Sequence, residues 1–296
     1  MRQLSLVVTC TDRKMARPAP ELLARNLPEG NVDHRVAIWD KRLGEVPRSF
    51  SLAQLYQGEH WVQVRVLVET AVSAGLSPQL WVASAGLGLQ SVSNTAPPYA
   101  ATFGARHADS VASTRTERTR WWGRLQEARG ATTLSELADQ GPALLVLSEP
   151  YAAAMHDELR AAGQRGDDVL LIGGERDIPG IHRVPANGAL RGALGGTLTS
   201  LNVRMAASWL KHWRTGRPLV SAETAASWKR WAAAAEHHER YQRTPMTDEE
   251  IREFIRTESA RNPGYSRTRL HRLLRESGRA CEQKRFALLY AATMEE

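Results

Sequence analysis

The chain has 296 residues, a hydrophobic content of 42% and a formal net charge of +7. This length suits one large α/β domain with a smaller appendage, and the basic charge favours a polyanionic partner, nucleic acid first. The only two cysteines, Cys10 and Cys281, exclude a disulfide framework and a CxxC metal pair. Because no signal peptide or run of transmembrane length is visible, we expect a cytoplasmic protein without a membrane partner.

Short apolar runs alternate with segments of helical period from the N-terminus to about residue 213. Several of the runs are continuous (LSLVV, ALLVLS, VLLIGG), as in strands buried on both faces of a sheet. The alternation predicts an α/β fold of three layers with a mostly parallel sheet. The predicted strands are 4–9, 34–39, 79–84, 143–148, 168–172 and 181–184, and the predicted helices are 56–74, 151–162 and 198–213.

The pattern changes near TGRPLVS, residues 215–221, and no strong strand follows. Helices are predicted at 222–242, after Thr247 and at 265–277. Thr247 and Glu250 have the spacing of a capping box, and Gly278 closes the last of these helices. We therefore predict two domains: an α/β catalytic domain at 1–215 and a helical, basic DNA-binding region at 216–296 that resembles a helix-turn-helix.

The first predicted strand ends in TCTDRK, which collects a carboxylate, hydroxyls and cations. In open parallel sheets, ligands bind at the carboxyl ends of the strands. Asp12 and Lys14 are therefore candidate catalytic residues, and Thr11 and Arg13 are candidate substrate contacts. Cys10 is better explained as packing, since nothing near it in the sequence supplies a base.

Later strand ends and one loop supply further candidates for contact with a base or substrate. Tyr99 and Phe103, in a loop of small residues, could stack on a base or could be core aromatics. Glu149 more readily caps a helix than takes part in catalysis. The remaining candidates are Ser84, Gly86, Tyr151, Asn187, Arg191 and Asn202.

Several common catalytic motifs are absent from the sequence. There is no P-loop, no GxSxG elbow, no HExxH and no HxE…CxxC zinc deaminase pattern. We therefore expect neither a metal nor a cofactor.

Two basic stretches are candidates for contact with DNA. The first contains Arg115, Arg118 and Arg120 beside Trp121 and Trp122. Arginines interleaved with aromatics could bind phosphates and bases, but helical spacing favours a buried Trp pair with solvated arginines. The second stretch has the charge of a helix-turn-helix recognition helix. Its candidate DNA contacts are Ser266, Arg267, Thr268, Arg269, Arg272, Arg275, Lys284 and Arg285.

The set TCTDRK, LYQGEHW, ASAGLGL followed by PPYAATF, LGGTLTSLN and ACEQKRF resembles an uncharacterised bacterial family. The N-terminal part of that family looks like the uracil-DNA-glycosylase-like α/β fold. The sequence is also similar to the anti-phage DNA glycosylases that inhibit bacteriophage replication by excising α-glucosylated hydroxymethylcytosine. The resemblance covers most of residues 1–215 at the level of motif order. It implies a DNA glycosylase that flips a modified base out of double-stranded phage DNA and leaves an abasic site.

In that fold a water-activating Asp follows the first strand, and Asp12 matches it. Asp12 is the only residue to which the family's catalytic role is assigned, because the family's surrounding sequence and its second motif are not found in this chain. Lys14 and Arg13 would then contact phosphate or the leaving base, and Asn187 and Arg191 would read the base. Three alternatives remain open: a DNA-binding regulator with a ligand-sensing α/β domain, an enzyme that processes nucleosides or nucleotides, and a toxin that acts on RNA.

Overall fold

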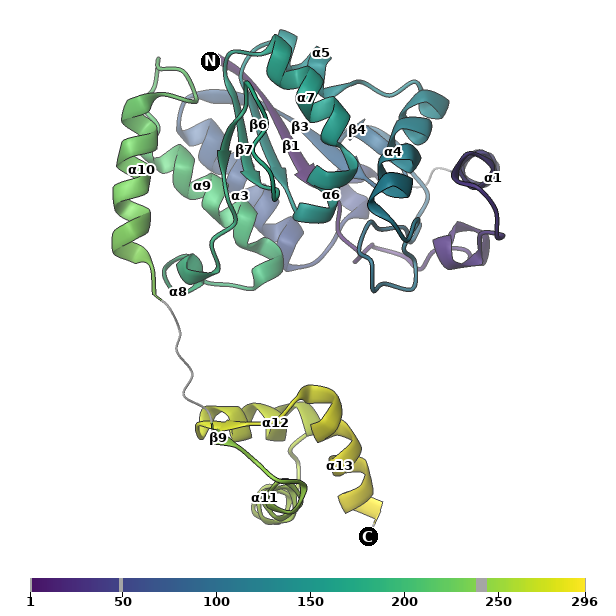
Figure 1. The fold of residues 1–296 in the computed structure, drawn as a ribbon, viewed down its shortest axis with the longest axis vertical. Coiled ribbons are helices and arrows are strands. Elements are labelled where there is room, and N and C mark those ends of the chain that lie inside the picture. Colours follow the sequence, from purple (N-terminus) through teal and green to yellow (C-terminus); the bar gives the residue numbers. More distant parts are fainter. Residues whose placement is uncertain (1, 48–49, 238–243, 296) are drawn as a thin grey trace. The chain divides into compact units, whose positions relative to one another are not determined.

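A computed structural model describes residues 2–47, 50–237 and 244–295 (Figure 1). The chain divides into two compact units, Met1–His237 and His238–Glu296. The first unit is an α/β structure built on a mixed six-stranded sheet, and the second is mostly helical. The prediction of an α/β fold with a mostly parallel sheet is thereby confirmed.

The central sheet has the strand order β4-β3-β1-β6-β7-β8. All neighbours are parallel except β3 and β4, which form an antiparallel edge. The strands are β1 (Arg2–Thr9), β3 (Leu76–Ser84), β4 (Gly88–Ser91), β6 (Ala143–Leu147), β7 (Val169–Gly173) and β8 (His182–Val184). A separate antiparallel pair joins β2 (Phe50–Ser51) to β5 (Thr95–Ala96).

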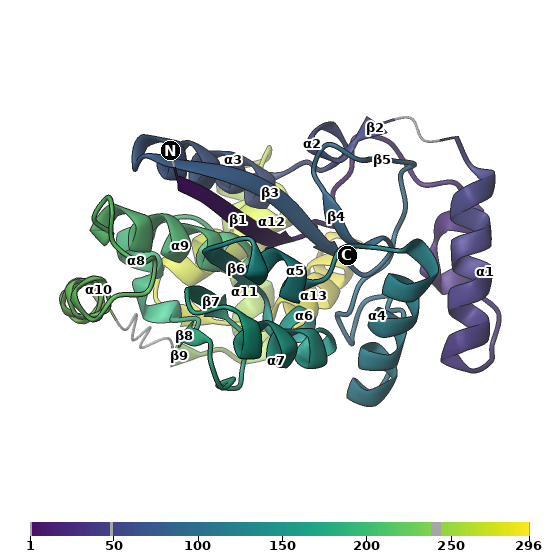
Figure 2. The ribbon, with the colours of Figure 1, turned by 90° about the horizontal axis from the view of Figure 1, so that it is seen from above.

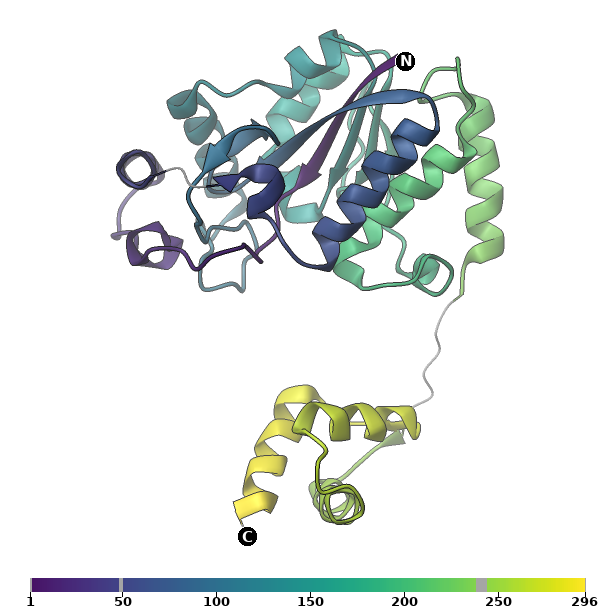
Figure 3. The same ribbon diagram turned by 180° about the vertical axis from the view of Figure 1, so that it is seen from behind.

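Helices cover both faces of the sheet, which gives three layers (Figure 2). One face carries α3 (Glu59–Ser73) and α9 (Leu201–His212), and Figure 3 shows this face toward the viewer. The other carries α5 (Leu134–Asp139), α6 (Glu149–Ala154) and α7 (His156–Arg165). Beyond them, α1 (Val32–Glu45) packs on α4 (Arg115–Arg129). The short elements are α2 (Leu52–Leu55), α8 (Arg191–Leu194) and the 3-10 turns Pro20–Leu22, Ala24–Asn26, Gly188–Leu190 and Leu198–Ser200.

Five of the six predicted strands exist close to their expected positions. In β1, β6 and β7 the continuous apolar runs are buried on both faces of the sheet. The predicted strand at 34–39 is wrong, since this segment lies inside α1. Asn31 caps that helix by accepting from the backbone N–H of His34. Val36, Trp39 and Leu43 then fall on one buried helical face, a period that a six-residue apolar run does not reveal.

The division between the units lies at His237, later than the expected boundary at 215/216. The turn after α9 is held to β7, because the Asp168 carboxylate accepts from the backbone N–H groups of Leu219 and Val220, both at 2.7 Å. The next helix, α10 (Ala222–Ala235), stacks Trp228 on Trp209 of α9 with ring centroids 5.8 Å apart. It therefore belongs to the first unit. The helix ends at Ala235, with Glu236 as its C-cap, so the predicted continuation is wrong at Glu236 and His237. The rest of the predicted continuation, residues 238–242, lies outside the described part.

The second unit packs three helices around a small core of its own. They are α11 (Asp248–Arg261), α12 (Arg267–Glu276) and α13 (Gln283–Glu295), joined by the parallel bridge of β9 (Thr244–Pro245) and β10 (Arg279–Ala280). The predicted capping box of Thr247 and Glu250 opens α11. Ile251, Leu270 and Phe286 are fully buried, one from each helix. The last helix, α13, was not predicted.

Within the described ranges, no helix is both long and apolar enough to cross a membrane.

Two helical glycines make opposite predictions for the stability of the first unit. A Cβ added to Gly163 of α7 would lie 2.3 Å from the Pro179 carbonyl oxygen, whereas one added to Gly123 of α4 would meet nothing within 4 Å. We expect Gly163→Ala to lower the free energy of unfolding by about 1–3 kcal/mol. Gly123→Ala should raise it by about 0.5–1 kcal/mol. Urea unfolding measures both, and a stabilised Gly163→Ala would contradict this packing.

Candidate functional site

The candidate site lies at the point in the sheet where the order of successive strands reverses. From β1 the chain crosses to β3 on one side, and it later returns to β6 on the other side of β1. Such a switch point is where open α/β sheets bind ligands, at the carboxyl ends of the strands. The loop after β1 contacts α6, the helix that follows β6, with Cys10 Sγ 3.1 Å from the Tyr151 hydroxyl oxygen.

Lys14 folds back and fixes the loop that carries Asp12. Its Nζ donates to the carbonyl oxygens of Thr11 at 3.0 Å and Asp12 at 3.4 Å, and it lies 4.3 Å from the ring centroid of Tyr99. Burial lowers the pKa of Lys14, while the nearby charges of Cys10, Asp12 and Asp109 act to raise it. With the Lys14 amine held by the loop backbone, the Asp12 side chain is left outside, 70% exposed.

A histidine from a distant loop faces the Asp12 carboxylate. His107 Nε2 lies 3.8 Å from Asp12 Oδ2. His107 Nδ1 accepts from the backbone N–H of Asp109 at 3.1 Å, so a neutral ring carries its proton on Nε2, toward Asp12. A carboxylate and an oriented imidazole N–H therefore lie together at the carboxyl end of β1, which gives the site one acceptor and one donor.

Asp109 anchors the loop that presents His107. Its carboxylate is 1% exposed and accepts from Arg25 Nε at 2.8 Å, from the Arg25 backbone N–H at 3.2 Å and from Arg25 Nη2. Burial acts to raise the pKa of Asp109, but the hydrogen bonds and charge of Arg25 outweigh it and hold the pKa below its usual range. The ends of the loop are closed by a parallel bridge between Thr102 and Ser110.

Ser84, Gly86 and Tyr99 form a buried network beneath this edge. The Ser84 hydroxyl accepts from the backbone N–H groups of Gly86 and Leu87, and it contacts the Tyr99 hydroxyl, which lies 2.7 Å from that of Tyr56. A Cβ on Gly86 would lie 2.5 Å from the Tyr99 ring, so the glycine makes room for it. Burial raises the pKa of Tyr99 well above its ordinary value, so the phenol stays protonated.

The expectation that Tyr99 or Phe103 stacks on a base is not supported by their position. Both rings are fully buried. Phe103 packs edge-on against Tyr151, with centroids 5.1 Å apart, and Tyr151 itself is 7% exposed. Because none of these rings offers a free face to solvent, the core-aromatic alternative describes them better, and they support the site from below.

Other predicted contacts fall into two groups. Arg13 and Glu149 are exposed and Thr11 is half-buried, and all three follow the carboxyl ends of strands. Glu149 lies in the first turn of α6, as expected for a residue that stabilises the helix. Asn187 and Asn202 are engaged within the protein. Asn187 caps a 3-10 turn and donates to Glu236, and Asn202 donates to the Leu147 carbonyl. Arg191 is half-buried and interacts within the protein.

The arginines of α4 do not form a free basic stripe. Arg120 and Arg124 both pair with Asp33, and Arg115 lies 3.6 Å from Glu175. Arg118 donates to the backbone carbonyls of residues 112 and 113. Trp121 and Trp122 are buried. The interpretation of this stretch as a core Trp pair is confirmed, and DNA contact by these arginines would require their present partners to be displaced.

In the second unit, α12 gathers many of the predicted DNA contacts around one groove. Ser266 caps the helix by accepting from the Arg269 backbone N–H. Arg269 stacks on Tyr265, with Cζ 4.0 Å from the ring centroid, and Arg272 pairs with Glu276. A groove of 590 Å³ is lined by Tyr265, Ser266, Thr268, Arg269, Arg272, Leu273 and Glu276. Arg267, Arg275 and Lys284 are exposed, whereas Arg285 pairs with Asp248.

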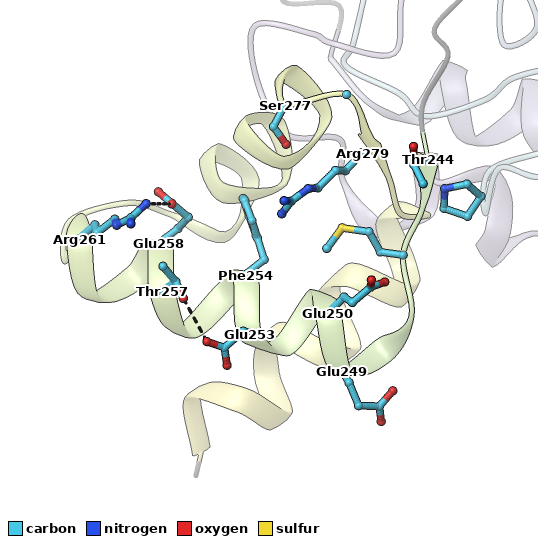
Figure 4. Close-up of a pocket in the computed structure, with 13 residues that line it drawn as sticks. Thr244, Glu249, Glu250, Glu253, Phe254, Thr257, Glu258, Arg261, Ser277 and Arg279 are labelled. Carbon is cyan, nitrogen blue, oxygen red and sulfur yellow. Dashed lines mark hydrogen bonds and ion pairs between the residues drawn. The ribbon is translucent and has the colours of Figure 1, made fainter.

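A larger groove of 940 Å³ on α11 is lined by more carboxylates (Figure 4). Phe254 and Met246 form its apolar part, and Glu249 and Glu253 lie along its rim. Arg261 and Arg279 line it as well, and Glu258 pairs with Arg261. The α11 groove is therefore less favourable for a polyanion than the α12 groove.

The described residues contain no group of three or more His, Cys, Asp or Glu side chains placed to hold a metal ion. The chain matches no protein-family model, no curated protein and no solved structure.

Two features of this edge were missed by sequence reasoning. Asp109 lies 97 positions from Asp12, and its only local signal was a His and an Asp within the loop GARHADS. Glu59 and His60, in the stretch LYQGEHW, were also missed as contacts. Glu59 accepts from Thr197, Ser200 and Arg204, and both ring nitrogens of His60 lie 3.1 Å from carbonyl oxygens, those of Thr9 and Thr199.

The buried carboxylate of Asp109 makes a prediction for pH dependence. Because its folded pKa is depressed, its stabilisation is present above the unfolded pKa of about 4 and is lost as pH falls through the lower folded value. At neutral pH, Asp109→Asn should lower the free energy of unfolding by roughly 2–3 kcal/mol, less than for a fully buried pair because Arg25 is half-exposed.

Denaturant unfolding from pH 7 to pH 3 measures the difference between the parent protein and Asp109→Asn, which should shrink below pH ~4. Asp139→Asn is the matched control, since it breaks an exposed ion pair with Arg165 and should cost at most about 1 kcal/mol. Equal losses for the two variants would contradict the anchoring role of Asp109.

Proposed function

We propose that the protein is a DNA glycosylase with a uracil-DNA-glycosylase-like first unit, and that it excises a modified base from double-stranded DNA and leaves an abasic site. The observation that carries this proposal is the exposed Asp12 carboxylate, 3.8 Å from His107 Nε2, at the switch point of a parallel sheet. It is the position at which the resemblance of the sequence expects a water-activating Asp.

Hydrolysis of an N-glycosidic bond needs little covalent chemistry from a protein. The base is swung out of the stack, which costs a few kcal/mol, and the sugar then develops positive charge. In the proposal the Asp12 carboxylate stabilises that charge and orients the attacking water. The imidazole N–H of His107 positions Asp12 and lies close enough to act as a donor at the reacting centre.

Lys14 has a positioning role in this mechanism. Its amine is engaged with two backbone carbonyls of the Asp12 loop and with the Tyr99 ring, so it fixes the loop rather than reaching outward. The buried Ser84 and Tyr99 hydroxyls support the loop from below. No step requires a metal or a cofactor.

The second unit supplies a DNA-binding surface in this proposal. The groove on α12 offers Arg269, a capped helix N-terminus and the Thr268 hydroxyl, groups that contact phosphates and base edges in helix-turn-helix proteins. Arg272 also lines the groove, but it would have to leave Glu276 to bind a phosphate. Double-stranded DNA is the expected partner. Following the resemblance, we propose α-glucosylated hydroxymethylcytosine in phage DNA as the substrate and defence against phages as the role.

The α12 surface by itself also favours a second candidate, a DNA-binding regulator whose α/β unit senses a ligand. A regulator needs no exposed carboxylate beside an oriented imidazole, and it leaves DNA chemically intact. Enzymes acting on free nucleosides or nucleotides need no such basic helix. Chemistry on DNA therefore separates the three functions.

The glycosylase function predicts a specific loss in Asp12→Asn. This change keeps the size of the side chain but removes the charge, so excision from phage DNA containing α-glucosylated hydroxymethylcytosine should fall by at least about 100-fold. Alkali-labile sites, counted on a gel after incubation, measure it. The affinity for the same DNA should be unchanged or slightly higher, since a negative charge is removed.

Asp157→Asn is the matched control, because Asp157 is exposed on α7 and the chemical change is the same. It should excise like the parent protein. If Asp12→Asn also does so, the role of Asp12 is wrong. If the parent protein binds the modified DNA but never makes it alkali-labile, the regulator describes the protein better.

A further inference from the structure

Most arginines near the candidate site have a partner within the first unit. Arg25 is taken by Asp109, Arg115 by Glu175, Arg120 by Asp33 and Arg183 by Asp177. An arginine whose charge is already matched by a carboxylate has less to gain from a phosphate, because binding would have to break the existing pair.

Arg106 and Arg176 differ from these arginines. Both side chains are exposed, and within the described residues neither has a hydrogen bond or an ion pair. The acidic neighbours of Arg176, Glu175 and Asp177, are paired with Arg115 and Arg183 instead. The loop after β7 therefore carries one cation, Arg176, whose neighbouring carboxylates are already paired with other arginines.

The same holds in the loop of Arg106, where the nearby carboxylate of Asp109 is engaged by Arg25. Arg106 immediately precedes His107, which faces Asp12. This cation is thus carried by the loop that completes the candidate site.

Arg13 is the third cation of this kind, and it is held in place by packing rather than by a charge. A Cβ on Gly58, whose φ is +92°, would lie 3.0 Å from Arg13 Cδ, so the arginine stem lies across the bare glycine backbone. The Arg13 carbonyl oxygen accepts from the Gln57 backbone N–H at 2.9 Å. No carboxylate among the described residues pairs with its guanidinium.

The three arginines come from loops near the carboxyl ends of the parallel strands. Arg13 follows β1, Arg176 follows β7, and Arg106 is in the loop that contacts Asp12. β1 and β7 are separated by β6 alone, which places the ends of these two strands about 10 Å apart. That distance is of the order that separates neighbouring phosphates along one strand of a duplex.

We propose that Arg13, Arg106 and Arg176, called here the arginine rim, bind the phosphodiester backbone of DNA beside Asp12. The proposal rests on the proposed function in that it takes DNA as the ligand of this edge. It assigns the backbone contact of the first unit to these loops and removes it from α4. The α12 surface of the second unit then contributes separate phosphate contacts.

The test measures how the affinity of the full-length chain for a short unmodified DNA duplex changes with salt. Each phosphate contact that is lost lowers the slope of log affinity against log salt by about 0.9. Arg106→Ala/Arg176→Ala should therefore lower the slope by about 1.8 and weaken binding at low salt. Its melting temperature should equal that of the parent protein, because neither side chain has a partner to lose.

Two double variants with the same change in net charge are the controls. Lys229→Ala/Arg230→Ala removes exposed cations of α10 that have no partner among the described residues. Arg120→Ala/Arg124→Ala removes paired cations from α4. Both should leave the slope unchanged. An unchanged slope in Arg106→Ala/Arg176→Ala, or equal reductions in all three variants, overturns the arginine rim. Because the duplex is unmodified, this result is independent of whether excision occurs.

Discussion

The site depends on the position of β1 between β3 and β6. This strand is the first of the chain and is paired in parallel on both sides, so its carboxyl end lies inside the sheet rather than at an edge strand. The connections that follow leave it in opposite directions across the sheet. The loop after Thr9 is therefore not covered by a crossover, and whatever chemistry it carries faces outward. The sequence places Asp12 there.

Two electrostatic contacts fix the positions of Asp12 and His107 at the carboxyl end of β1. Lys14 draws the Asp12 loop down onto Tyr99, and Arg25 holds Asp109 so that the next loop brings His107 to the carboxylate. Each contact joins segments far apart in the chain. Beneath them, a buried network of Ser84, Tyr56 and Tyr99 hydroxyls supports both loops with groups that stay uncharged.

The sheet was largely predictable because its buried strands are continuous apolar runs, and Thr247 caps its helix as the sequence suggested. The apolar run around Trp39 misled because a short run does not distinguish a strand from a buried helical face. The partners of charged groups could not be predicted at all. Arg120 meets Asp33, and Asp12 meets His107, only through tertiary packing, so sequence spacing carries no signal for either pair.

The number of basic residues in a segment does not show whether it can bind phosphate, because carboxylates engage some of them. Among the described residues, Arg115, Arg120 and Arg124 of α4 pair with carboxylates, whereas the three arginines of the arginine rim do not. The second unit shows a similar contrast, since the groove on α11 is lined by more carboxylates than the groove on α12. Net charge favoured a polyanion as partner, and the pairing pattern is the basis of the proposed binding surface.

The proposed activity is hydrolysis of an N-glycosidic bond in DNA by the groups that follow β1. It can be measured by mass spectrometry of the small-molecule fraction after incubation of the protein with phage DNA that contains α-glucosylated hydroxymethylcytosine. A glycosylase releases the free glucosylated base and leaves the DNA backbone intact until alkali is added. Released nucleotides, or no released base while the protein remains bound to the DNA, would exclude this activity.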